Sequence, residues 1–160
     1  PQAIAALREA HPYEEPAIDI TTVLPQPQPN TGAGRVVRLQ KALSLNQVAE
    51  MARTHLNLDG VEVADGAGAP VKHKVLAACP GSGADLIPEA AAAGATVFLT
   101  GEMKHHEQLQ ALRHGMSLIL AGHTNTERGV FKPWTKVLQK AFPDINIKRS
   151  RRDRHPLRRV

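Results

Sequence analysis

KVLAACPGSG, residues 74–83, is the first of three apolar runs that each end in a glycine turn. TVFLTG (96–101) and MSLILAGH (116–123) repeat this pattern at a spacing of about 20 residues. Segments compatible with helices, 85–93 and 103–113, separate the runs. Continuous apolar strands that alternate with helices are typical of a sheet buried on both faces, with mostly parallel strands. The predicted fold class is therefore α/β, with a mostly parallel sheet flanked by helices.

The sequence around this repeat predicts further elements. Short strands are expected at 36–39 and 61–63, and Ser44 is a favourable N-cap for a helix whose apolar residues recur at helical spacing. Residues 17–24 are rich in β-branched side chains and indicate a strand, and a last strand is expected to start at Ile145.

Prolines and glycines divide the chain. Three prolines and two glycines within residues 25–34 are typical of a linker. Residues 1–24 precede this linker, residues 35–150 carry the α/β repeat, and residues 151–160 form a basic tail. Because the chain does not begin with methionine, we expect a fragment of a longer protein.

Composition excludes several classes of protein. The chain has 160 residues, of which 42% are hydrophobic, enough for one domain with its own core. No run of 18 apolar residues exists, so a membrane span is not expected. The single cysteine, Cys79, cannot form an internal disulfide, and a reducing cytoplasm is the default location. Cys79 lies in an apolar run, which favours a buried hydrophobe over a nucleophile.

The positive charge is concentrated at one end of the chain. The net charge is +5, but residues 148–160 hold seven basic side chains against one acidic side chain. The preceding residues are nearly neutral, with 13 basic and 14 acidic side chains. The tail has no interleaved aromatic residues, so nucleic-acid binding is not indicated, although nonspecific contact with polyanions stays open.

His123 and Glu127 form the sharpest candidate site. They follow the third apolar run and are four residues apart. If a helix begins at or between them, both side chains point to one side. Thr126 or Asn125 is expected to cap the helix that includes Trp134, Val137, Leu138 and Ala141. Imidazole and carboxylate are ligands for zinc, iron and manganese. The alternative is that Glu127 caps or salt-bridges the helix start while His123 is a turn residue.

Glu102 follows the second apolar run and is a candidate catalytic residue, either orienting a ligand or acting on a water. Ligands of parallel sheets gather beyond the carboxyl ends of the strands, where Glu102, His123 and Glu127 are all expected. His105 and His106 are adjacent on a predicted helix and point about 100° apart, so both cannot readily face one ion.

The turn after the first apolar run contains Gly81, Ser82 and Gly83. Because a helix is expected to follow, these residues are candidates to present backbone N–H groups to an anion. The sequence is neither a complete P-loop nor a full Gly-x-Gly-x-x-Gly motif, and a plain tight turn is the alternative reading.

Three segments together resemble the Nif-three-like family of dinuclear metal-binding proteins. HPYEEPA (11–17) is similar to the motif that ends the inserted α+β subdomain of long-form members. GSG (81–83) and LTGEMKH (99–105) resemble turns of the core, and GHTNTERG (122–129) resembles the C-terminal metal signature. The resemblance implies the C-terminal half of a long-form member, with residues 1–24 as a remnant of the inserted subdomain.

The resemblance also implies a site and an assembly. His123 and Glu127 match the two C-terminal metal ligands, with Glu127 able to bridge two divalent ions. The remaining ligands, a histidine pair and an aspartate, belong to an N-terminal half outside these 160 residues. Thr124 replaces the His or Tyr that commonly follows the ligand histidine. Members form toroidal homo-oligomers, typically hexamers, with two ions in each complete subunit.

Members of this family are often named GTP cyclohydrolase I type 2. The predicted function is thus a metal-dependent hydrolase acting on a small molecule or nucleotide, by GTP ring opening or by another nucleotide or phosphoester hydrolysis. The alternative is a non-enzymatic oligomeric regulatory or interaction protein with a structural metal, in which residues 148–160 contact partners.

Overall fold

The computed structural model describes residues 2–21, 31–152 and 155. The chain divides into two compact units, Pro1–Thr31 and Gly32–Val160, and the division lies within the predicted linker 25–34. Most of that linker and most of the predicted tail 151–160 lie outside the described residues. Within the described part, no helix is both long enough and apolar enough to cross a membrane.

The second unit contains a five-stranded sheet with the strand order β1-β3-β4-β5-β2. The three central strands are parallel, whereas β1 and β2 pair antiparallel at the two edges. The elements in chain order, with η for short 3₁₀ helices, are α1 (Gln2–Ala10), β1 (Arg35–Leu43), α2 (Leu45–Leu56), β2 (Glu62–Ala64), β3 (His73–Ser82), η1 (Ala84–Leu86), α3 (Ile87–Ala92), β4 (Val97–Glu102), α4 (His105–Arg113), β5 (Ser117–Leu120), α5 (His123–Glu127), η2 (Arg128–Val130) and α6 (Phe131–Ala141).

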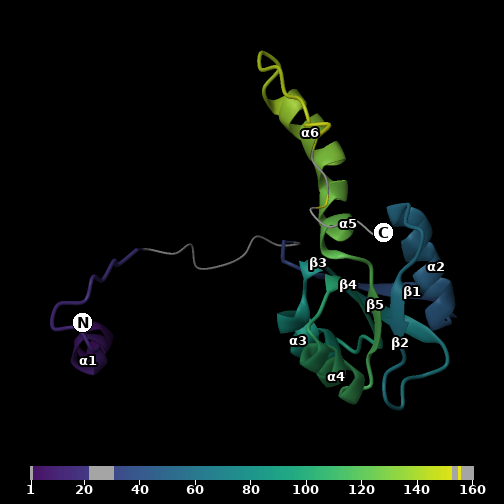
Figure 1. The fold of residues 1–160 in the computed structure, drawn as a ribbon, viewed down its shortest axis with the longest axis horizontal. Helices are drawn as coiled ribbons and strands as arrows, with labels where there is room; N and C mark the ends of the chain where they lie inside the picture. The colour runs from purple at the N-terminus through teal and green to yellow at the C-terminus, as the bar shows by residue number, and fades with distance from the viewer. Residues whose placement is uncertain (1, 22–30, 153–154, 156–160) are drawn as a thin grey trace. The chain divides into compact units, whose positions relative to one another are not determined.

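Helices cover both faces of the sheet (Figure 1). Helices α3 and α4 lie on one face, where Ile87, Ala90 and Ala111 join Phe98 and Leu118 in a buried cluster. Helix α2 lies on the other face and packs on Val97 and Ile119 through an apolar stripe, Leu45, Val48 and Ala49. Adjacent residues of β4 and β5 thus enter opposite clusters, which confirms the predicted sheet buried on both faces and the predicted α/β class.

Ser44 begins α2 as the sequence predicts. Its hydroxyl accepts a hydrogen bond from the Gln47 amide at 3.3 Å, and the Gln47 side chain accepts one from the Ser44 amide at 2.9 Å. This reciprocal capping box fixes the first turn of the helix. Cys79 is buried, and burial raises the pKa of its thiol, which confirms that it is a core residue.

Two predicted strands are absent from the described residues. Ala17–Thr21 has no strand partner, and residues 145–147 continue as irregular chain after α6, with Ile145 57% exposed. β-branched composition alone does not form a strand, because the backbone groups need a neighbouring strand with which to pair. The predicted helix 85–93 is instead a 3₁₀ turn followed by the short helix α3.

Candidate metal-binding site

The third glycine turn places His123 and Glu127 on one side of a short helix. Gly122 adopts a φ of +87°, a left-handed conformation that favours glycine, and α5 begins at the next residue. His123 and Glu127 are one helical turn apart, and the His123 Nε2 atom lies 3.2 Å from a carboxylate oxygen of Glu127. The sequence expectation that both side chains point the same way is therefore confirmed.

Glu102, at the end of β4, holds the other side of the imidazole. Its Oε1 atom lies 2.9 Å from His123 Nδ1. Two carboxylates thus flank one imidazole ring, and all three side chains remain partly exposed to solvent. The hydrogen bond to Glu102 raises the pKa of His123, and the negative charges of Glu127 and Glu102 add to this effect.

The side chains of His123 and Glu127 approach the backbone of Gly81 closely. A Cβ atom at this position would lie 2.6 Å from Glu127 Oε1 and 3.3 Å from His123 Nε2. The backbone of Gly81 has a φ of +71° and sits where the register between β3 and β4 shifts, between Cys79 and Ser82. The strand therefore continues through an irregularity rather than ending in the predicted turn, and the absence of a side chain at Gly81 lets Glu127 and His123 approach its backbone closely.

Two threonines that the sequence analysis missed fix this geometry. The Thr126 hydroxyl accepts a hydrogen bond from the Gly81 amide at 2.9 Å and donates one to the His123 carbonyl at 2.8 Å. The fully buried Thr100 hydroxyl donates to the Gly81 carbonyl and accepts from the Gly83 amide, both at 3.1 Å. Neither Thr126 nor Asn125 caps a helix, contrary to prediction. The only signal in the sequence for Thr100 and Thr126 was their position beside the glycine turns.

The same bonds argue against an anion site at Gly81, Ser82 and Gly83. Gly81 and Ser82 belong to β3, and the amides of Gly81 and Gly83 already donate to threonine hydroxyls inside the protein. The 3₁₀ turn that follows has only three residues. A short turn with its amides already bonded has little to offer a phosphate.

The donor chemistry of the pair fits a divalent metal ion. An imidazole nitrogen and a carboxylate lie side by side, and a second carboxylate orients the imidazole from behind. A closed site would need further donors, since residues 2–21, 31–152 and 155 contain no group of three or more His, Cys, Asp or Glu side chains placed to hold an ion. His105 and His106 lie exposed at the start of α4.

A Glu102→Gln variant is expected to lower the pKa of His123, because the hydrogen bond to Glu102 is the main cause of the upward shift. Two-dimensional NMR of the imidazole resonances during a pH titration measures this change. The raised pKa of His123 also makes the stability of the fold depend on pH. A raised folded-state pKa stabilises the fold below the ordinary histidine pKa of about 6.5, and that contribution disappears as the pH rises through the folded value.

The stability difference between wild type and Glu102→Gln should therefore appear only on the acidic side. Glu89→Gln, on the exposed surface of α3, is the matched control and should leave the His123 titration unchanged. An unaltered His123 pKa in Glu102→Gln would mean that the contact does not persist in solution.

Comparison with known proteins matches the chain to one family along most of its length. Residues 3–156 match the sequence model of Duf34/NIF3 (NGG1p interacting factor 3). The chain is 40% identical over 134 residues to the NIF3-like protein 1 of Mus musculus, covering 82% of this chain and 35% of that protein. It is 37% identical over 131 residues to a Listeria innocua protein named GTP cyclohydrolase 1 type 2 homolog, covering 82% of this chain and 34% of the relative.

Solved structures with a similar fold match nearly the whole chain. A Bacillus cereus protein related to NIF3 superposes with a TM-score of 0.66 at 27% identity, covering 99% of this chain and 44% of that chain. A Staphylococcus aureus protein superposes with a TM-score of 0.68 at 27% identity, covering 99% and 45%. The chain thus spans about a third of the length of the curated relatives it matches.

Proposed function

Because this chain belongs to the Duf34/NIF3 family, we propose that it supplies two ligands, His123 and Glu127, to the divalent-metal site of a metal-dependent hydrolase. The observation that carries this proposal is that an imidazole nitrogen and a carboxylate meet against the backbone of Gly81. Zinc, iron and manganese all suit this pair of donors. Two ions per complete subunit, as the resemblance implies, remain part of the proposal.

The role of each side chain follows from its contacts. Glu102 accepts a hydrogen bond at His123 Nδ1, so in the neutral, metal-binding form of the ring the Nδ1–H tautomer would leave the Nε2 lone pair for an ion beside Glu127. Glu127 offers a carboxylate on the open side of α5. We assign the remaining donors to the region of the longer relatives that this chain does not span.

The proposed reaction is a hydrolysis. When bound, divalent ions polarise the scissile group and lower the pKa of a bound water. Glu102 is exposed at the end of β4, where it keeps the imidazole in position and is the candidate to accept a proton. GTP ring opening is one candidate reaction, suggested by the printed name of the Listeria innocua relative, and other nucleotide or phosphoester hydrolysis is another.

Metal analysis of His123→Ala and Glu127→Ala, made in the longer protein that supplies the remaining donors, tests the proposal. Each variant is expected to retain at least tenfold less zinc or manganese after dialysis, because removing either donor dismantles the pair. Elemental analysis by mass spectrometry gives the metal content, and His105→Ala, an exposed histidine on α4, is the matched control. Unchanged metal content in both site variants would refute the proposal.

Activity measurements separate the hydrolase from its rival. Metal-loaded protein is incubated with GTP and with a panel of nucleotides and phosphodiesters. If the two variants lose metal but metal-loaded wild type hydrolyses nothing, a structural metal in a non-enzymatic oligomeric protein becomes the better description. The homo-oligomer, typically a hexamer, and the cytoplasmic location also remain predictions, and light scattering of the purified protein tests the first.

A further inference from the structure

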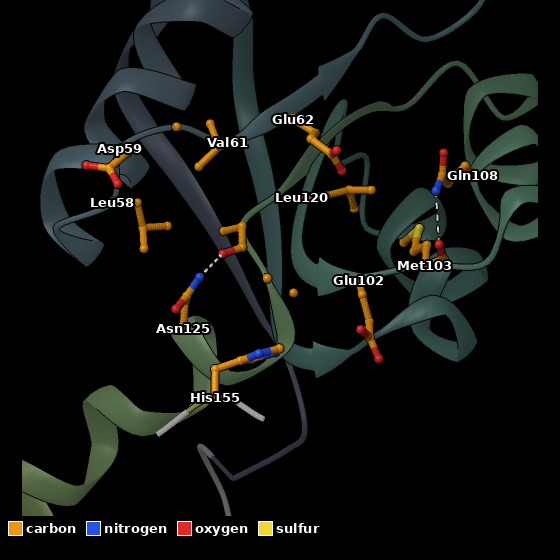
Figure 2. Close-up of a pocket in the computed structure, with 14 residues that line it drawn as sticks. Leu58, Asp59, Val61, Glu62, Glu102, Met103, Gln108, Leu120, Asn125 and His155 are labelled. Atoms are coloured by element: carbon orange, nitrogen blue, oxygen red, sulfur yellow. Dashed lines mark hydrogen bonds between the residues drawn. The ribbon is translucent and has the colours of Figure 1, made fainter. Parts of the chain in front are cut away.

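A hollow of about 610 Å³ opens beside the candidate site, at the carboxyl ends of β4 and β5 (Figure 2). Glu102 lines it and also contacts His123, so the hollow and the proposed metal ligands share a side chain. Gly101, within β4, and Gly122, which precedes α5, also line it. The volume is within the range of a small-molecule pocket.

The far wall of the hollow is the connection between α2 and β2. Asn57 adopts a left-handed φ of 54° and turns the chain at the end of α2. The Leu58 carbonyl then accepts a hydrogen bond from the Arg53 guanidinium at 3.0 Å, and Glu62 pairs with Leu120 as β2 joins the sheet. The wall is thus fastened at both ends, by a helix terminus and by a strand.

The lining accepts hydrogen bonds and carries negative charge. Asp59, Glu62 and Glu102 contribute carboxylates, and His155 is the one basic side chain among the 14 described lining residues. Two amides also line it. The Asn125 nitrogen donates to the Ala121 carbonyl at 2.8 Å and the Gln108 nitrogen to the Met103 carbonyl at 2.9 Å. These bonds orient the amides and leave their oxygens as acceptors for a ligand.

We propose that this hollow binds a portion of the substrate that bears amino, amidino or guanidino N–H groups. Such groups donate to carboxylates and amide oxygens and are attracted by the negative lining, whereas a phosphate would be repelled. Leu58, Val61 and Leu120 supply apolar surface for the carbon skeleton of the same portion. The proposal rests on the proposed hydrolase function, because it places the N–H-bearing portion on one side of Glu102 and the hydrolysed group on the other.

Binding to the metal-free chain, followed by ¹H–¹⁵N NMR, tests this assignment. Cytidine carries a neutral amino group, and uridine, of nearly the same size, has a carbonyl in its place. Agmatine supplies a cationic guanidinium, and inorganic phosphate supplies an anion. We expect cytidine, agmatine or both to shift the amide resonances of the lining glycines Gly60, Gly101 and Gly122, at concentrations where uridine and phosphate do not. Which of the two probes binds distinguishes a neutral from a charged source of the N–H groups.

Variants assign the binding to the lining. Glu62→Gln and Asp59→Asn should each weaken the binding of agmatine about three- to tenfold, since each removes one charged acceptor. Glu89→Gln, an exposed carboxylate outside the hollow, should have no effect. His123→Ala should abolish metal retention while leaving probe binding intact. The metal-site proposal and the binding proposal for the hollow can therefore be refuted independently of each other. Two results with the wild-type chain would overturn the proposal, whatever the variants show. One is that neither cytidine nor agmatine shifts the glycine resonances. The other is that uridine or phosphate shifts them equally.

Discussion

Gly81→Ala, made in the longer protein that supplies the remaining donors, is expected to abolish metal retention while the protein stays folded. The new Cβ would lie 2.6 Å from Glu127 Oε1, closer than any relaxed contact, and 3.3 Å from His123 Nε2. The carboxylate is the end of a flexible side chain, so it can swing away at little cost to the fold. That movement takes the carboxylate away from the imidazole, and the two ligands no longer converge. Elemental analysis after dialysis measures the loss.

A matched glycine separates crowding from backbone strain. Gly94 has a φ of +76°, close to the +71° of Gly81, but a Cβ there would meet no atom within 4 Å. Both alanine variants should lose about 1–2 kcal/mol of unfolding free energy, measured with urea, because alanine is strained in a left-handed conformation. Only Gly81→Ala should lose metal, so equal metal contents in the two variants would contradict the proposed role of Gly81.

The titration of His123 gives a second readout that needs no metal. Glu127 contributes to the raised pKa of His123, so displacing its carboxylate should lower that pKa in Gly81→Ala and not in Gly94→Ala. An unchanged pKa would mean that the Glu127 carboxylate accommodates the methyl group without leaving the imidazole.

The sequence predicts those parts of the fold that depend on contacts between residues close together in the chain. The capping box at Ser44 involves only residues within one helical turn, and the apolar runs of β4 and β5 are long enough to read as buried strands. The convergence of His123 and Glu127 follows from helical spacing, because residues four apart lie on one side of any helix. Strand direction at the edges does not follow in this way, and β1 and β2 are both antiparallel.

Long-range contacts decide the features that sequence analysis missed. The segment Pro80–Ser82 reads as a turn, yet it continues β3 because Thr100 and Thr126, distant in sequence, bond to the backbone of Gly81. The hollow likewise depends on residues 58–62 lying beside the end of β5. No periodicity marks either arrangement, since each pairs groups that only the folded chain brings together.

Phe98→Ala is expected to remove a large part of the stability of the second unit. Phe98 is 1% exposed and lies in the centre of the sheet, paired with Ala77 of β3 and with Leu118 of β5. Truncating a buried phenylalanine costs about 3–5 kcal/mol, against a total of roughly 5–15 kcal/mol for a typical domain. Urea denaturation followed by circular dichroism measures the loss.

The small neighbours of Phe98 limit how far this cavity can collapse. Only 3% of the residues are aromatic, and the cluster around Phe98 includes the small side chains Ala77, Ala90 and Ala111, which have no flexible atoms to move into the void. Phe98→Leu keeps most of the volume and should cost less than about 1.5 kcal/mol. Phe142→Ala removes a ring that is 50% exposed and should change stability by no more than about 0.5 kcal/mol. Similar losses for Phe98→Ala and Phe142→Ala would show that Phe98 does not occupy the core of the folded chain.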